Sequence, residues 1–214
     1  MTDLTNLPFD ITPEHFFDEV LPDVLGEVEY PDGLGQERMQ FNIVGDEGIE
    51  RHIGFANEID EDGDEVECLT IEDGQAAAPP IAITASVDDF RAIVAGDLRD
   101  RIKDEVGEVP LGPRQLRHAF MPDAKVQQVK TLSGDLQVQI VDDEAGATYT
   151  VTQTIGGGKP NTETPSCKVV LDVPTLLEIA SGRQQAQQLF MMGKVRIEGD
   201  MSLVLQLMTI MTAR

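Results

Sequence analysis

The sequence is poor in cysteine and histidine, the side chains that most often bind metals. Its 214 residues include two cysteines and three histidines. Cys68 and Cys167 are far apart and have no metal-ligating companions nearby, so no metal site is expected. Two cysteines allow one disulfide at most, and we expect two reduced thiols in a cytoplasmic protein. The histidines share no motif spacing with an acid or a thiol, so no catalytic group is expected.

Long apolar runs are also missing. No stretch of about 18 uninterrupted apolar residues occurs, which excludes a membrane-spanning helix. The first ten residues have neither the basic region nor the apolar run of a targeting segment. Hydrophobic residues make up 41% and charged residues 26% of the chain, which is typical of a globular protein. The length fits one large domain or two small ones.

Basic residues are scarce, and their distribution is uneven. The chain has 16 basic and 39 acidic residues and a net charge of −23. Residues 1–110 hold 29 acids and 6 bases, whereas residues 111–214 hold 10 of each. The excess should repel nucleic acid and anionic membrane surfaces, so neither a nucleic-acid partner nor stable membrane insertion is expected. The acidic half either confers solubility or faces a basic protein partner, and the oligomeric state stays unknown.

The first half has clear helix and strand signals. Thr12 is a good N-cap for a helix that Pro22 is expected to end. Alternating or β-branched segments predict strands at 39–44, 51–57, 65–71 and 81–85. Ser86 to Asp89 then resembles a capping box ahead of a helix that Gly96 ends or interrupts.

The second half repeats this plan. Strands are predicted at 136–141, 148–155 and 168–171, and Asp172 is the N-cap of a helix ended by Gly182. Ser86 and its helix align without gaps on Asp172 and its helix, which indicates a duplication. The glycine- and proline-rich segment 106–113 suggests domains at 1–110 and 111–214. Because the second half offers one strand fewer, the two halves are expected to complete one another.

The C-terminal segment carries the most distinctive pattern. A helix with Leu189 and Phe190 on one face is followed by Gly193, a good helix-ending residue. A half-buried strand comes next, and Asp200 caps a last helix at 201–211. That helix is apolar except for a narrow stripe of Ser202, Gln206 and Thr209, so most of its surface is expected to be covered.

The run from Phe190 to Met201 resembles the closing motif of the sterol carrier protein family. The resemblance covers residues 134–214 well and residues 12–97 loosely. It implies an α+β fold with a mixed five-stranded sheet and helices that enclose an apolar tunnel, here duplicated with a degenerate N-terminal copy. It also implies binding of a sterol, fatty acid, acyl-CoA or phospholipid, without a cofactor, metal or catalytic residue. The first half lacks a counterpart of Gly193-Lys194 and an apolar closing helix.

A set of apolar side chains in the second half is the candidate lipid-binding site, with ordinary core as the alternative for each. The set is Leu177, Phe190, Met191, Met192, Leu203, Val204, Leu207, Met208 and Met211. The alternative function is a structural or dimerisation module with a filled core. Calcium binding at Asp60, Asp62 and Asp64 is disfavoured because the sixth loop position is Glu65 instead of glycine.

Overall fold

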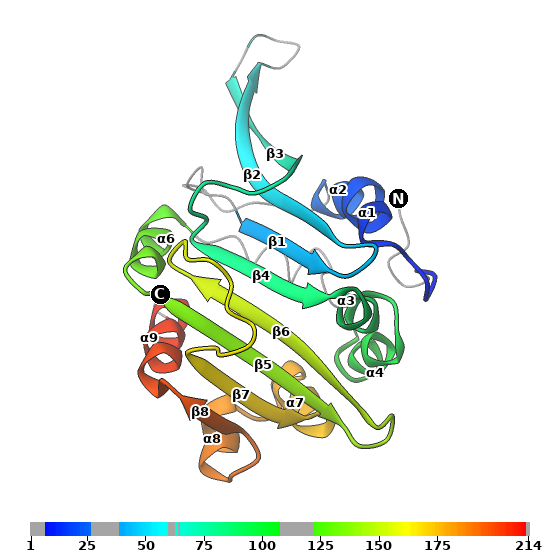
Figure 1. Cartoon of the computed structure of the whole chain (residues 1–214), viewed down its shortest axis with the longest axis vertical. Helices are drawn as coiled ribbons and strands as arrows, with labels where there is room; N and C mark the ends of the chain where they lie inside the picture. Colours follow the sequence, from blue (N-terminus) through cyan, green and yellow to red (C-terminus); the bar gives the residue numbers. More distant parts are fainter. Residues whose placement is uncertain (1–6, 27–38, 60–62, 64, 108–121, 213–214) are drawn as a thin grey trace.

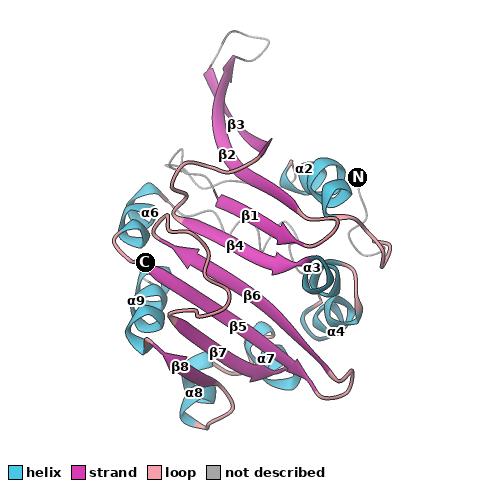
Figure 2. Cartoon of the chain, in the orientation of Figure 1, coloured by secondary structure: helices cyan, strands magenta, loops and turns pink. Residues whose placement is uncertain are grey.

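One mixed eight-stranded sheet runs through the whole molecule, with helices packed along it (Figures 1 and 2). The computed structural model describes residues 7–26, 39–59, 63, 65–107 and 122–212. The strands are β1 Met39–Val44, β2 Ile49–Ile59, β3 Glu65–Asp73, β4 Ile81–Ser86, β5 Gly134–Asp142, β6 Ala147–Ile155, β7 Cys167–Asp172 and β8 Arg196–Gly199. The helices are α1 Pro13–His15, η2 Phe16–Val20, α2 Leu21–Leu25, α3 Val87–Val94, α4 Asp97–Val106, α6 Asp123–Lys130, α7 Val173–Ala180, α8 Ala186–Met191 and α9 Met201–Thr212.

The strand order shows how the two halves are joined. It is β3-β2-β1-β4-β6-β5-β7-β8, and the antiparallel pair β4–β6 connects the halves. The α+β class is confirmed, but the sheet has eight strands, so the expected five-stranded sheet was too small. The second half contributes four strands from β5 to β8, and β4 of the first half adds a fifth beside them.

The strands of the two halves are connected in the same order. In each, a hairpin strand pairs in parallel with a later strand, β1 with β4 and β5 with β7. That later strand leads into a capped helix. The Ser86 Oγ accepts a hydrogen bond from the Asp89 backbone N–H at 3.0 Å, and the Asp172 Oδ1 accepts one from Thr175 at 2.8 Å. Both predicted caps are therefore confirmed, whereas a common origin of the halves stays a prediction.

The sheet has one apolar face and one polar face. On β5, Leu136 and Ile140 are buried in two hydrophobic clusters that helices cover, while Asp135 and Gln137 point to the opposite face because side chains alternate along a strand. The polar face is covered by loops: Gln137 donates to the Thr162 carbonyl at 2.9 Å. No buried side-chain nitrogen or oxygen within the described residues lacks a partner.

The first helix does not end where the sequence predicts. It continues past Pro22 to Leu25, because a π-helical turn, η2, precedes the proline. The Leu21 backbone N–H bonds to the Phe16 carbonyl, five residues back. Such a bulge lets a helix tolerate a residue that has no N–H of its own.

Some predictions concern parts of the chain outside the described residues. These predictions are the disfavoured calcium site at Asp60, Asp62 and Asp64, most of the domain boundary at 106–113, and the reduced thiol of Cys68. Cys167 is buried and is a free thiol. Over the described ranges, no helix is long and apolar enough to cross a membrane. The same residues contain no group of three or more histidine, cysteine or acidic side chains placed to hold a metal ion.

Candidate functional site

The closing motif acts through backbone geometry. Gly193 has a φ of 75° and its N–H donates to the Phe190 carbonyl at 2.9 Å, which ends α8. Gly199 has a φ of 90°, and a Cβ there would collide with the Ser166 carbonyl. The Asp200 Oδ1 then accepts a hydrogen bond from the Ser202 N–H at 2.9 Å and caps α9. Hydrogen bonds from the Ser202 hydroxyl and backbone hold the pKa of Asp200 below its usual range.

The motif directs part of α9 onto the apolar face of the sheet. Leu203 and Val204 are buried there, and Leu207 packs partly buried beside them. Their neighbours include Val126 and Val129 of α6 and Leu136 of β5. Three of the predicted site residues therefore form the contact between α9, α6 and the sheet.

The other predicted residues lie elsewhere. Leu177 and Phe190 are half-buried in a separate cluster at α7 and α8. Met191 and Met192 are 81% and 62% exposed, and Met208 is also exposed. The side chain of Met211 lies outside the described part. The expectation that α9 is covered on most of its surface was wrong, since its Met201 and Leu205 are exposed too.

A groove runs between α6 and α9, and we call it the α6–α9 groove. Its volume is about 410 Å³, and it is lined by Gln128, Thr131, Leu132, Leu205, Gln206, Thr209 and Ile210. Three aliphatic side chains combine there with four amides and hydroxyls, which suits a ligand with an apolar and a polar part. The predicted polar stripe of α9 supplies Gln206 and Thr209. None of the nine predicted site residues lines this groove. Its aliphatic residues Leu132, Leu205 and Ile210 were missed, because the sequence does not show that α6 packs beside α9.

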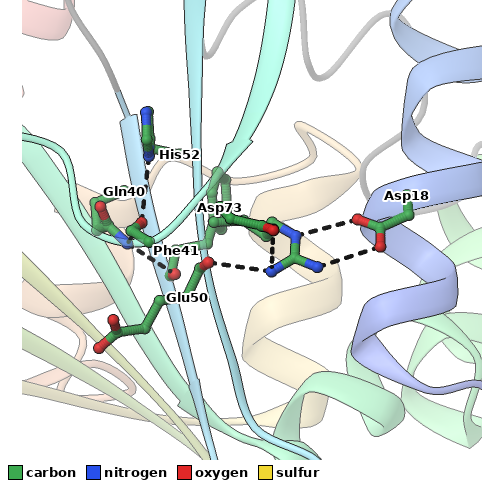
Figure 3. A network of polar contacts seen from close by, with 8 residues as sticks. Asp18, Gln40, Phe41, Glu50, His52 and Asp73 are labelled. Carbon is green, nitrogen blue, oxygen red and sulfur yellow. Dashed lines mark hydrogen bonds and ion pairs between the residues drawn. The ribbon is translucent and has the colours of Figure 1, made fainter.

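A second groove lies in the first half, between α2 and β3, and we call it the first-half groove. Its volume is about 540 Å³, and it is lined by Phe17, Asp18, Pro22, Leu25, Gly26, Leu69 and Ile71. The Arg51 guanidinium fixes its Asp18: Nε and Nη2 donate to the two carboxylate oxygens at 3.1 and 3.2 Å (Figure 3). Arg51 also pairs with Asp73 of β3 at 2.7 Å, so it ties η2 to the strands.

The apolar cluster at α7 and α8 is tightly packed. Its Val173 and Leu189 are fully buried, and so is Leu98, which comes from α4 of the first half. The contact between α4 and α7 is supported by an ion pair between Arg183 and Glu105. At these positions the space between the helices and the sheet is filled by side chains.

Comparison with known families identifies the C-terminal segment. Residues 114–212 match the model of the SCP-2 sterol transfer family. This match confirms the resemblance that the run from Phe190 to Met201 indicated. It does not include the first half, so the degenerate N-terminal copy stays a prediction. A search of curated proteins found no significant match.

Several solved structures of sterol carrier proteins are similar to this chain. The apo form of sterol carrier protein 2 from Yarrowia lipolytica is 18% identical, with a TM-score of 0.33, and the match covers 56% of this chain and 91% of that one. Sterol carrier protein 2 like 2 from Aedes aegypti is 20% identical, with a TM-score of 0.29 and coverage of 51% and 89%. The palmitated form of that mosquito protein gives 20% identity, a TM-score of 0.31 and coverage of 55% and 93%.

Proposed function

Because residues 114–212 match the SCP-2 sterol transfer family, we propose that this protein binds an apolar or amphipathic lipid and acts without catalysis. The family supports lipid binding or transfer in general. The finer proposal is that the lipid lies against α9, in the α6–α9 groove. One observation carries this choice: the groove of about 410 Å³ lies within the matched segment and combines aliphatic walls with amide and hydroxyl groups.

Burial of the apolar part of the ligand would supply the affinity, without a charged contact. Each buried methylene contributes about 0.8 kcal/mol, so an acyl chain of about 16 carbons would gain roughly 13 kcal/mol if it were fully enclosed, before the costs of association. The α6–α9 groove has three aliphatic side chains and can bury only part of such a chain. Gln128 and Gln206 would face the polar end of the lipid.

A filled structural or dimerisation module is the second candidate function. The tight packing of Leu98, Val173 and Leu189 favours it, because no ligand is needed to fill that part of the core. The two candidates differ in one respect: a filled module binds no lipid at either groove.

Titration with a fluorescent fatty acid tests the proposal and locates the site. We expect Leu205→Gln to weaken binding about tenfold or more, since burying a leucine contributes about 1.5–3 kcal/mol. Leu205 is 55% exposed, so the variant should keep its melting temperature.

Leu69→Gln in the first-half groove is the matched control, and we expect it to bind like the unmodified protein. Loss of binding in Leu69→Gln alone would place the site in the first half and contradict the choice of groove. Absence of binding by the unmodified protein would favour the filled module.

A further inference from the structure

The charge around the first-half groove is predominantly negative. Of the described residues that line this groove, Asp18 alone is charged, and the others are aliphatic, aromatic, proline or glycine. Residues 7–26, which include its helical wall, contain five acids and no lysine or arginine. Residues 69–75, which include its strand wall, contain two acids and again no lysine or arginine. The first-half groove is therefore an apolar cleft with an acidic rim.

Arg51 lies beside the groove but does not offset this charge. Its guanidinium donates to both carboxylate oxygens of Asp18 and pairs with Asp73 at 2.7 Å (Figure 3). Its Nη1 also donates to the Glu50 backbone carbonyl at 3.3 Å. The hydrogen bond with Asp18 and the surrounding carboxylates raise the pKa of Arg51 above its usual value. One base thus stands against two acids, and its side chain is only 12% exposed.

The carboxylates of the rim are accessible to a partner. The side chains of Asp18, Glu19 and Asp73 are 44%, 72% and 83% exposed. Glu14, one helical turn before Asp18, is exposed as well. Three of these four carboxylates come from α1 and η2, and one comes from β3 on the other wall. Carboxylates that are spread over both walls match several bases carried along one peptide chain better than they match a single ammonium group.

The apolar part of the groove lies at an edge of the sheet. In the described sheet, β3 is the outermost strand. Its Leu69 and Ile71 are two residues apart and so project to the same face. Both pack against the core of the first half but are only partly buried. The volume of about 540 Å³ between them and α2 admits large apolar side chains of a partner.

We propose that the first-half groove docks a basic, amphipathic segment of a protein partner. Leucine or aromatic side chains of the segment enter the groove, and its lysines or arginines pair with the exposed carboxylates on both walls. Anionic ligands, fatty acids among them, are disfavoured because the Arg51 guanidinium is already held by two carboxylates. A second copy of this chain is disfavoured because it carries the same net charge of −23.

This docking is independent of the lipid-binding proposal. In Figure 1, α2 and β3 lie on the opposite side of the molecule from α9, and the two grooves have no lining residue in common. A peptide can therefore occupy the first-half groove whether or not a lipid occupies the α6–α9 groove.

Fluorescence anisotropy of the full chain with a dye-labelled peptide of leucine and lysine tests this surface. We expect the peptide to bind, and a control peptide with serine in place of leucine to bind about tenfold or more weakly, because the apolar contacts are lost. Leu69→Gln should weaken binding of the leucine peptide about tenfold for the same reason. Glu14→Gln should weaken it about threefold, as expected for one exposed ion pair. Because Glu14 is exposed, this variant keeps the test valid even if Leu69→Gln lowers the melting temperature.

Two variants serve as matched controls. Glu163→Gln removes the same charge at an exposed position of the second half and should bind the peptide like the unmodified protein. Leu205→Gln should also keep peptide binding while it loses fatty-acid binding, so failure of this proposal and failure of the lipid-binding proposal are distinguishable.

Several outcomes would overturn the proposal. They are no binding by the unmodified protein, equal binding of the serine peptide, unchanged binding in Leu69→Gln, and an effect of Glu163→Gln as large as that of Glu14→Gln. A dimer in light scattering that Leu69→Gln abolishes would also overturn it, because a second copy would then occupy the groove.

Discussion

At the scale of single residues, the side chain of Asp142 links the two halves through an ion pair. It ends β5, is 2% exposed and pairs with Arg101 of α4 at 2.7 Å. Burial alone would raise its pKa. Hydrogen bonds from the Ala145 and Glu144 backbones and from Arg101 outweigh burial, and the pKa lies below the ordinary value of 3.8. A carboxylate with a lowered pKa stabilises the fold above that ordinary value and loses its contribution as the pH falls through the folded-state pKa.

Asp142→Asn should therefore destabilise the protein in a pH-dependent way. At pH 7 we expect a loss of about 1–3 kcal/mol, because the variant keeps an acceptor for the backbone but loses the charged partner of Arg101. Below pH 3.8 the difference from the unmodified protein should shrink. Urea denaturation at pH 7, 5 and 3 measures this. Asp143→Asn, at the exposed neighbouring position, is the control, and a difference that stays constant over this range would contradict the account.

At the scale of elements, α4 belongs to the first half but packs into the second. It runs from Asp97 to Val106, and its Leu98 and Ile102 enter the cluster at α7 and α8. Arg101 and Glu105 add ion pairs to Asp142 and Arg183. The helix thus supplies part of the apolar cluster that lies under α7 and α8 of the second half.

Leu98→Ala tests this role of α4. We expect a loss of about 2–5 kcal/mol, as for other buried leucines that leave a cavity. Leu205→Ala makes the same chemical change at an exposed helical position and should cost less than about 0.5 kcal/mol. Chemical denaturation of both variants gives the comparison. Equal stability of the two variants would mean that α4 does not support the second half.

Elements fixed by neighbouring residues could be predicted from the sequence. The caps at Ser86, Asp172 and Asp200 were expected and are present, because each depends on a side chain within three residues of the N–H it binds. The continuation of the first helix past Pro22 to Leu25 was not predicted, because the π-helical turn that allows it has no clear local sequence signal. The α6–α9 groove and the place of Leu98 were also missed, because both depend on tertiary packing.

At the scale of the whole molecule, one sheet carries both halves. The pair β4–β6 makes the sheet continuous, and α4 crosses from one half to the other. We therefore propose that residues 1–110 and 111–214 fold as one unit and complete one another. The charge, in contrast, is divided unevenly between the halves, because residues 1–110 hold 29 acids and 6 bases whereas residues 111–214 hold 10 of each.

Mass spectrometry of lipid extracted from the natively purified full chain tests the central claim most directly. The account predicts that a sterol, fatty acid, acyl-CoA or phospholipid is recovered, and that removing it restores binding of a fluorescent fatty acid. Repeated absence of any bound lipid, together with no binding of the fluorescent fatty acid, would contradict the account and favour a filled structural module.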